Sequence, residues 1–276
     1  MNNVLVTGAS GFLGSHVVDD LMYHGFNVIG TCRGGEYRVN ELAQLVRVEL
    51  SNQQEVKNLF ERFNPDYVVH CAGLASTPAC IASPSDCERD NFTATRVLID
   101  LAELYRVKRF VFASSNVVYG AATPYRRCKL ASEFALHYSA LNSCSLRFGN
   151  LYGEDQPYKG RNCNFIAAAV NAKRNGTPLP IFGDGSSKRD WLHVDDAARA
   201  VRLAVRSQCF YTDVVDICTG RAVTVREIAE ALKLVVDWQP TREGDVTSLP
   251  QEAETAKRLL RFEAKTNLLG WLCDLS

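Results

Sequence analysis

The first fourteen residues constrain the fold of this chain more than any other segment. The apolar stretch Val4-Leu5-Val6-Thr7 leads into glycines that recur every third residue, at Gly8, Gly11 and Gly14. In a parallel α/β sheet, a strand, such a turn and a following helix direct helix N-terminal N–H groups toward a pyrophosphate. The segment therefore predicts a dinucleotide site, which would be formed by Gly8, Ser10, Gly11, Phe12, Leu13 and Gly14.

Strand-like and helix-like patterns alternate through the first half of the chain. Strands are expected at residues 4–7, 27–32, 45–49, 67–72, 109–114 and 143–148. Helices are expected between them, at residues 12–24, 52–63, 90–105 and 125–141. This alternation predicts an α/β fold with a doubly wound parallel sheet and right-handed crossovers.

A smaller lobe is expected in the second half, where Gly/Pro-rich turns begin near Gly153. Its helices are predicted at residues 165–174, 225–235 and 252–260, whereas residues 195–206 and 214–218 are expected to return to the first domain. We therefore predict a dinucleotide-binding domain of residues 1–153 and about 190–220, and a substrate lobe of about 154–189 and 221–276.

The charge balance restricts the partners, because 31 basic and 31 acidic residues give a net charge of zero. That balance argues against a nucleic-acid or anionic-membrane partner. No apolar run approaches the roughly 20 residues of a membrane span, and we expect no signal peptide, because residues 1–8 carry no basic segment and lead straight into a strand. None of the ten cysteines forms a C-x-x-C pair, and the five histidines do not cluster with them. These features predict reduced thiols in a cytoplasmic protein without a metal site.

A catalytic group is predicted around Tyr125 and Lys129, which lie four residues apart and so share one face of a helix. A lysine ammonium favours a nearby phenolate and lowers the tyrosine pKa. The phenolate then takes a hydroxyl proton while hydride leaves the same carbon for a nicotinamide. Ser115, at the end of the strand before this helix, is placed to hydrogen-bond the reacting oxygen.

The end of the second strand bears on the choice of dinucleotide. An NAD site usually has an acidic residue there, which hydrogen-bonds the ribose 2′-hydroxyl. By spacing, Cys32 takes that place and Arg33 follows it. A guanidinium pairs with a 2′-phosphate or stacks on adenine, so the sequence favours NADP slightly over NAD. The alternative is a solvated arginine beside a site that takes NAD.

Several segments together resemble the extended short-chain dehydrogenase/reductases, and among them the nucleotide-sugar epimerase/dehydratase group. The resemblance covers nearly the whole chain. It rests on Thr7-Gly8-x-x-Gly11-x-x-Gly14, His70-Cys71-Ala72-Gly73, Ser114-Ser115-Asn116-Val117-Val118-Tyr119-Gly120, Arg147-Phe148-Gly149-Asn150, Phe182-Gly183-Asp184-Gly185, Arg189-Asp190-Trp191-Leu192-His193-Val194-Asp195-Asp196, Ile217-Cys218-Thr219-Gly220 and Arg242-x-Gly244-Asp245.

The resemblance implies roles for particular residues. Further cofactor contacts are implied for Glu49, Leu50, Cys71, Ala72, Gly73, Ser114, Tyr125, Lys129 and Phe148. A nucleotide-diphosphate sugar would be held by Ser115, Asn150, Arg189 and Arg242, with two guanidiniums suited to bidentate phosphate contacts. The alternative for Arg189 is a salt bridge with Asp190 or Asp195, and His193 is expected to be a packing residue. A homodimer formed through residues 90–105 and 125–141 is also implied.

Departures from the family pattern limit the possible reactions. The link between Gly120 and Tyr125 is short, which should open the substrate cleft or change which sugar fits. Asn116 and Val117 stand where a dehydratase would carry an Asp-Glu pair, and they cannot supply its acid and base. The sequence favours a 4-epimerase that acts through a transient 4-keto sugar. An NADPH-dependent reductase of 4-keto nucleotide sugars is the alternative, followed by a non-catalytic dinucleotide sensor.

Overall fold

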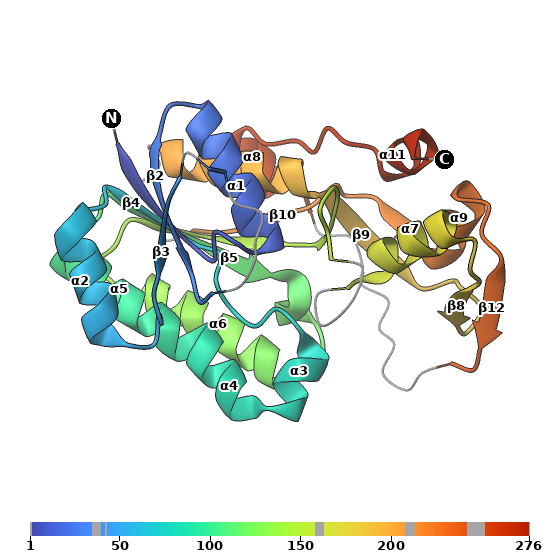
Figure 1. Cartoon of the computed structure of the whole chain (residues 1–276), viewed down its shortest axis with the longest axis horizontal. Helices are drawn as coiled ribbons and strands as arrows, with labels where there is room; N and C mark the ends of the chain where they lie inside the picture. Colours follow the sequence, from blue (N-terminus) through green and yellow to red (C-terminus); the bar gives the residue numbers. More distant parts are fainter. Residues whose placement is uncertain are drawn as a thin grey trace.

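A seven-stranded parallel sheet forms the centre of the molecule (Figure 1). The computed structural model describes residues 2–34, 40, 41, 43–157, 163–207, 213–241 and 252–275. The strand order is β10-β6-β5-β4-β1-β2-β3, and every neighbouring pair is parallel. The strands are β1 (Asn3–Thr7), β2 (Asn27–Cys32), β3 (Gln44–Arg47), β4 (Tyr67–His70), β5 (Arg109–Ser115), β6 (Ser143–Phe148) and β10 (Asp213–Ile217). The predicted doubly wound sheet is confirmed, and its order reverses between β1 and β4, where such sheets bind ligands.

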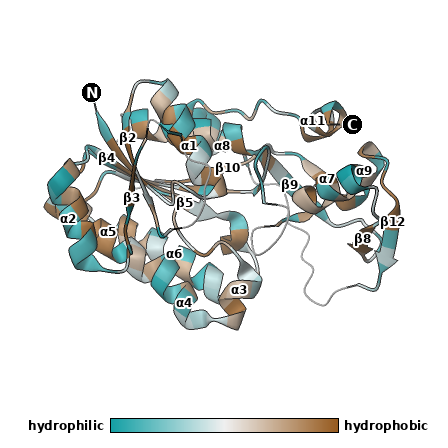
Figure 2. Ribbon diagram, in the orientation of Figure 1, coloured by the Kyte–Doolittle hydropathy of each residue, from teal (hydrophilic) through white to brown (hydrophobic). Residues whose placement is uncertain are grey.

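Helices cover both faces of this sheet (Figure 1). On one face, α1 (Phe12–Tyr23) and α8 (Val194–Arg206) bury apolar residues such as Val17 and Val201 against the strands. On the other face lie α2 (Gln53–Phe63), α5 (Ala94–Leu104) and α6 (Pro124–His137), which contribute residues such as Phe60 and Leu98 to a second core. Figure 2 shows that hydrophobic residues follow the central strands.

Shorter elements connect β4 to α5 and β5 to α6. The first connection contains α3 (Thr77–Ala82), α4 (Pro84–Glu88) and a π-helical turn, η1 (Arg89–Thr93), that continues into α5. The second contains a 3₁₀ turn, η2 (Asn116–Tyr119), whose end is followed by the link to α6. The helix predicted at 90–105 is therefore two consecutive elements.

The smaller part of the chain has its own core. Strands β7 (Asn150–Tyr152), β9 (Lys188–His193) and β11 (Ala222–Thr224) form one sheet, and β8 (Leu179–Phe182) pairs with β12 (Val236–Gln239). Helices α7 (Phe165–Asn175), α9 (Val225–Ala231) and α11 (Leu268–Asp274) pack on these strands. Two residues of α10 (Glu254–Leu260), Ala256 and Leu260, instead join the core of α1 and α8. The domain boundaries stay a prediction, and α10 packs with the larger core.

Several elements end earlier than the sequence predicted. The strand expected at 67–72 ends at His70, because the chain then turns to pass the glycines after β1. The helix expected at 125–141 ends at His137. The helix expected at 225–235 ends at Ala231, and Lys233 has a φ of 52°, a left-handed conformation that redirects the chain into β12.

Two findings concern the composition. No helix within the described residues is long and apolar enough to cross a membrane. The nine cysteines among those residues are all free, as predicted for reduced thiols.

Gly14 determines how closely α1 packs on the turn after β1. A Cβ atom at this position would lie 2.0 Å from the carbonyl oxygen of Gly8 and 3.1 Å from Ala9 Cα. Both atoms belong to the backbone, which cannot rotate away as a side chain would. The absence of a side chain at Gly14 therefore allows the first turn of α1 to meet the end of β1.

Replacing Gly14 with alanine should lower the free energy of unfolding by about 1–3 kcal/mol, the usual cost of overpacking. Gly270→Ala in α11 is the matched control, because its new Cβ would lie 3.6 Å from the nearest atom, Asn267 Oδ1. Removing that helical glycine should leave stability unchanged or raise it by up to about 1 kcal/mol. Urea unfolding followed by circular dichroism measures both, and equal midpoints for the two variants would contradict this packing.

Candidate active site

The carboxyl ends of β1, β4, β5 and β6 form one edge of the sheet, and most predicted site residues lie along it. Gly8 follows β1, Cys71 follows β4, and Ser115 ends β5. Phe148 is the last residue of β6 and is 4% exposed. Because carboxyl ends of parallel strands meet at one edge, residues far apart in the sequence are brought together here.

The turn after β1 fits a dinucleotide diphosphate. Gly8 has a φ of 67°, and a Cβ there would lie 2.7 Å from Ala72 N. Gly11 is exposed and is the N-cap of α1, with no side-chain cap and no acidic residue in the first turn. Helix N-terminal N–H groups without a capping side chain attract an anion, and the macrodipole adds to that attraction. The residues present therefore suit a diphosphate, and the predicted contacts Ser10, Phe12 and Leu13 lie in this turn and at the start of α1.

The segment after β4 lies directly against this turn. The backbone of Ala72 is the nearest neighbour of the virtual Cβ at Gly8, and the Ala72 N–H is donated to Thr7 Oγ1 at 3.3 Å. Gly73 has a φ of 148°, and a Cβ there would lie 2.5 Å from Asn91 Oδ1. The backbone of Cys71, Ala72 and Gly73 thus lies close to the predicted adenosine-binding site.

At the end of β2, beside the predicted adenosine site, Arg33 forms an ion pair. Its Nη1 donates to Asp90 Oδ2 at 2.7 Å, and Asp90, with a side chain 6% exposed, is also contacted by Arg89 Nε at 2.9 Å. Glu49 is half-buried and accepts hydrogen bonds from the Ser51 N–H and hydroxyl, while Leu50 is buried in the core. The end of β2 therefore carries an arginine whose charge is matched by a buried carboxylate.

The predicted catalytic residues converge at the end of β5. Tyr125 and Lys129 lie on the buried face of α6, and Lys129 Nζ is 5.8 Å from the centre of the Tyr125 ring. Lys129 Nζ donates to the Ala113 carbonyl at 2.7 Å and lies 4.6 Å from the Phe112 ring centre. Tyr125 is hydrogen-bonded to Ser115, whose Oγ also accepts from the Val117 N–H. The three side chains thus form one continuous group.

Burial controls the protonation of this group. It raises the pKa of Tyr125, and the hydrogen bond with Ser115 offsets only part of that rise. Burial also lowers the pKa of Lys129 to about 8. The sequence predicted that the lysine ammonium would lower the tyrosine pKa. In the folded polypeptide desolvation instead raises that pKa, and the neighbour that lowers it is Ser115 rather than Lys129.

Sequence reasoning missed Glu133, which is buried one helical turn beyond Lys129. Its carboxylate accepts from the Ser114 hydroxyl and from Arg147, whose Nη2 lies 2.6 Å from Glu133 Oε2. Arg147 also donates to the Tyr119 hydroxyl at 2.7 Å. The spacing of Tyr125, Lys129 and Glu133 at every fourth residue would have revealed this position. Glu133 ties α6 to β5 and β6 beside the catalytic group.

The predicted substrate residues lie on the neighbouring small sheet. Asn150 begins β7 and pairs with Trp191 of β9, and Arg189 lies two residues before Trp191. Both Asn150 and Arg189 are half-buried. Arg242 lies outside the described residues. His193 is buried and contacts the Tyr152 and Trp271 rings, as expected for a packing residue.

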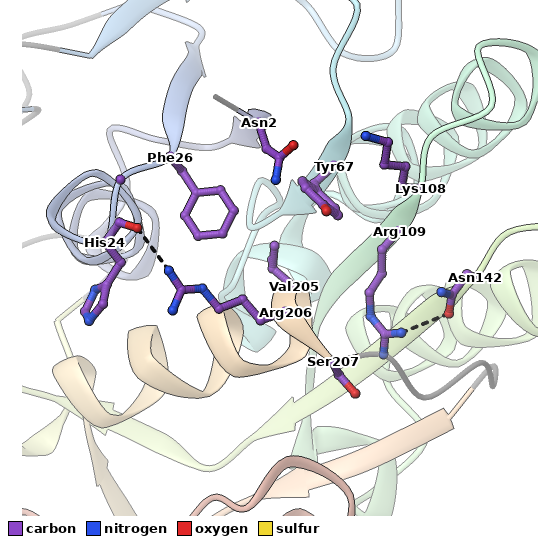
Figure 3. A pocket seen from close by; sticks show the side chains of 11 residues that line it. Asn2, His24, Phe26, Tyr67, Lys108, Arg109, Asn142, Val205, Arg206 and Ser207 are labelled. Carbon is purple, nitrogen blue, oxygen red and sulfur yellow. Dashed lines mark hydrogen bonds between the residues drawn. The ribbon is translucent and has the colours of Figure 1, made fainter.

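A pocket of about 750 Å³ lies at the opposite, amino-terminal edge of the large sheet (Figure 3). Phe26, Tyr67 and Arg109 line it, and Arg206 donates to the carbonyl of His24 at 3.0 Å. These residues begin strands or follow helices at the far end from Tyr125. The pocket is therefore separate from the candidate site.

Similarity to known proteins extends over nearly the whole chain. Residues 4–210 match the sequence model of the NAD dependent epimerase/dehydratase family. The chain is 27% identical over 323 residues to a UDP-glucose 4-epimerase of Bacillus subtilis, covering 98% of this chain and 95% of that protein. A UDP-glucose 4-epimerase structure from Thermotoga maritima with UDP-glucose matches with a TM-score of 0.92 and 30% identity, covering 98% and 96% of the two chains. A Thermus thermophilus UDP-glucose 4-epimerase complex with NAD matches with a TM-score of 0.88 and 27% identity, covering 98% and 96%.

The lowered pKa of Lys129 predicts a pH-dependent contribution to stability. With a folded pKa of about 8 against an ordinary 10.5, the unfolded chain binds the extra proton between these values. Stability should therefore rise with pH across that window, by about 3 kcal/mol for this group. Buried thiols titrate there in the opposite sense, so the quantity to measure is the unfolding free energy of the wild type minus that of Lys129→Met. A difference that stays constant from about pH 8 to pH 10.5, between the folded and the ordinary pKa, would show that the ammonium carries no burial penalty.

Proposed function

Because this chain belongs to the NAD-dependent epimerase/dehydratase family, we propose that it is a nucleotide-sugar 4-epimerase acting through a transient 4-keto sugar. The observation that carries the proposal is the convergence of Ser115, Tyr125 and Lys129 at the sheet edge beside the glycine turn. The Bacillus and Thermotoga proteins to which the chain is similar are both UDP-glucose 4-epimerases, so a UDP-sugar is the proposed substrate class.

The residues proposed to hold the cofactor are those of the glycine turn, together with Cys71, Ala72 and Gly73 at the adenosine and Ser114 and Phe148 nearer the reacting end. Bound NAD supplies a hydride acceptor and donor for the sugar C4. The Thermus relative is a complex with NAD. The Arg33 guanidinium is already paired with the buried Asp90, so a 2′-phosphate would have to share it with that carboxylate. NAD is therefore the proposed cofactor, and the predicted preference for NADP lacks support.

Tyr125 is the proposed general base and acid. Its phenolate takes the proton of the C4 hydroxyl, and the phenol so formed later returns it, while the Ser115 hydroxyl holds the same oxygen. Burial makes this phenolate costly, so the deprotonated form that acts as the base needs a positive charge nearby. Lys129, held by the Ala113 carbonyl, supplies that charge while the tyrosine is deprotonated.

An epimerase must hold the nucleotide firmly and the hexose loosely, so that the keto sugar can present its other face. Arg189, Asn150 and Arg242 are the proposed diphosphate contacts. The short link before α6 ends at Thr123. Its Oγ1 caps the helix by accepting a hydrogen bond from the Arg126 N–H at 3.2 Å. With few polar groups available from this link, the sugar pocket would place little restraint on the hexose.

We also propose that the protein is a homodimer formed through α5 and α6. These helices present large apolar side chains to solvent, with Leu104, Phe134 and Tyr138 respectively 66%, 60% and 81% exposed. Phe134 and Tyr138 share one face of α6, since they lie four residues apart. A second copy packed on these helices would cover that surface.

Tyr125→Phe should reduce turnover of a UDP-sugar by at least about a hundredfold, the usual contribution of a general acid–base group. Dinucleotide affinity should be unchanged, because the substitution removes only the hydroxyl and the aromatic ring remains. Tyr23→Phe is the matched control, since Tyr23 is 88% exposed and lies on α1. Coupled assays of epimerisation measure turnover, and tryptophan quenching measures affinity. Undiminished turnover in Tyr125→Phe would mean that another group moves the proton.

On denaturation, the freshly purified protein should release about one NAD per chain. An epimerase recycles its hydride and has no need to exchange cofactor. Mass spectrometry of the released nucleotide identifies it. Loosely held NADP would favour the reductase of 4-keto nucleotide sugars instead. Protein without any bound dinucleotide would likewise count against a self-contained hydride cycle.

A further inference from the structure

Three potential metal ligands meet where the small sheet joins α8. Glu154 follows β7, His193 ends β9, and Asp195 lies in the first turn of α8. One ligand atom from each residue lies within 4.8 Å of the other two. The hydride-transfer group at the end of β5 uses none of these residues. An imidazole and two carboxylates are the donors that first-row divalent metals take in proteins.

The burial of His193 is a second, independent observation. Its side chain is 5% exposed, and its Nε2 makes no hydrogen bond within the described residues. Nε2 points to Glu154 Oε2 at 3.2 Å. Two ligands that share one metal at about 2.1 Å are separated by roughly 3.0–3.4 Å, so this spacing is that of neighbouring ligands. If Nε2 binds the metal, the ring proton must lie on Nδ1. Nδ1 then loses the long, 3.3 Å hydrogen bond that it accepts from the Asp195 N–H.

Neighbouring side chains hold the two carboxylates in place. Trp271 Nε1 donates to Glu154 Oε1 at 2.8 Å, and His16 Nδ1 lies 2.7 Å from Asp195 Oδ1. The other two carboxylate oxygens lie near different nitrogens of the His193 ring, Glu154 Oε2 at 3.2 Å from Nε2 and Asp195 Oδ2 at 3.8 Å from Nδ1. Outer contacts that orient ligands in this way are typical of built metal sites.

An acidic pocket gives a cation access to the two carboxylates. It has a volume of about 750 Å³, and its lining includes His16 together with Asp19, Asp20, Glu154, Asp155 and Asp195. No lysine or arginine is among the described residues that line it. Clefts lined by charge of one sign concentrate counter-ions, so the pocket raises the local concentration of cations.

We propose that Glu154, His193 and Asp195 bind one divalent transition-metal cation. The cation joins the chain after β7 to the start of α8, and through His16 and Trp271 it couples α1 to α11. Its role is to fix the small sheet against the large one, and it does not depend on the proposed epimerase activity.

The test is Mn²⁺ binding followed by the electron paramagnetic resonance signal of the free ion. Mn²⁺ is the probe because the nine free cysteines would compete for Zn²⁺ but bind Mn²⁺ poorly. The purified chain, treated with a chelator and dialysed, should bind one Mn²⁺. Glu154→Gln retains an acceptor for Trp271 but loses the charged ligand, and should weaken binding at least about tenfold.

Asp155→Asn is the matched control. It removes one charge from the same pocket without removing a ligand, and asparagine tolerates the left-handed φ of 60° at this position. Its affinity for Mn²⁺ should stay within about threefold of that of the wild type, because an exposed charge is screened by solvent and contributes little. Equal losses in both variants would mean diffuse attraction by the pocket and would overturn the site, as would the absence of stoichiometric binding. Selective broadening of His193 and His16 ring signals by Mn²⁺, with His137 unaffected, would place the ion at these ligands.

Discussion

The contact between two stretches of backbone, the glycine turn after β1 and the start of α1, is the constraint on which the site depends. Gly14 lies so close to the Gly8 carbonyl that no side chain fits there, and Ala72 closes the other side of Gly8. These contacts bring the helix N-terminus, the end of β1 and the end of β4 to one point. The anion-binding N–H groups are therefore fixed by packing, before any ligand binds.

Helix α6 sets the geometry of the chemistry in a similar way. Tyr125, Lys129 and Glu133 follow one face at intervals of four residues, and each meets a different part of the sheet edge. Lys129 bonds a β5 carbonyl, and Glu133 pairs with Arg147 of β6. Because the helix is anchored at its buried end by an ion pair, the phenol at its other end is held against Ser115. That anchoring keeps the phenol away from water, and the burial raises its pKa.

Local patterns were enough to predict the sheet, the glycine turn and the face of α6, because these depend on residues close in the sequence. Partnerships across the fold could not be predicted. Arg33 meets Asp90 across 57 positions, and no local pattern indicates that this carboxylate is buried beside it. The helix ends at His137 and Ala231 were also missed, since tertiary packing and a left-handed residue decide where those helices stop. Arg242 was predicted from resemblance alone.

The Arg33–Asp90 pair changes what an arginine at the end of β2 means. An arginine free in solvent would favour a second phosphate, whereas one that neutralises a buried carboxylate has its charge already balanced. Removing Arg33 would leave Asp90 with only Arg89 as its counter-charge, so Arg33 has a structural role whichever dinucleotide binds. The side chain at this position therefore cannot be interpreted without its partner. An arginine whose charge is already paired with a carboxylate is compatible with NAD, the dinucleotide of the Thermus relative.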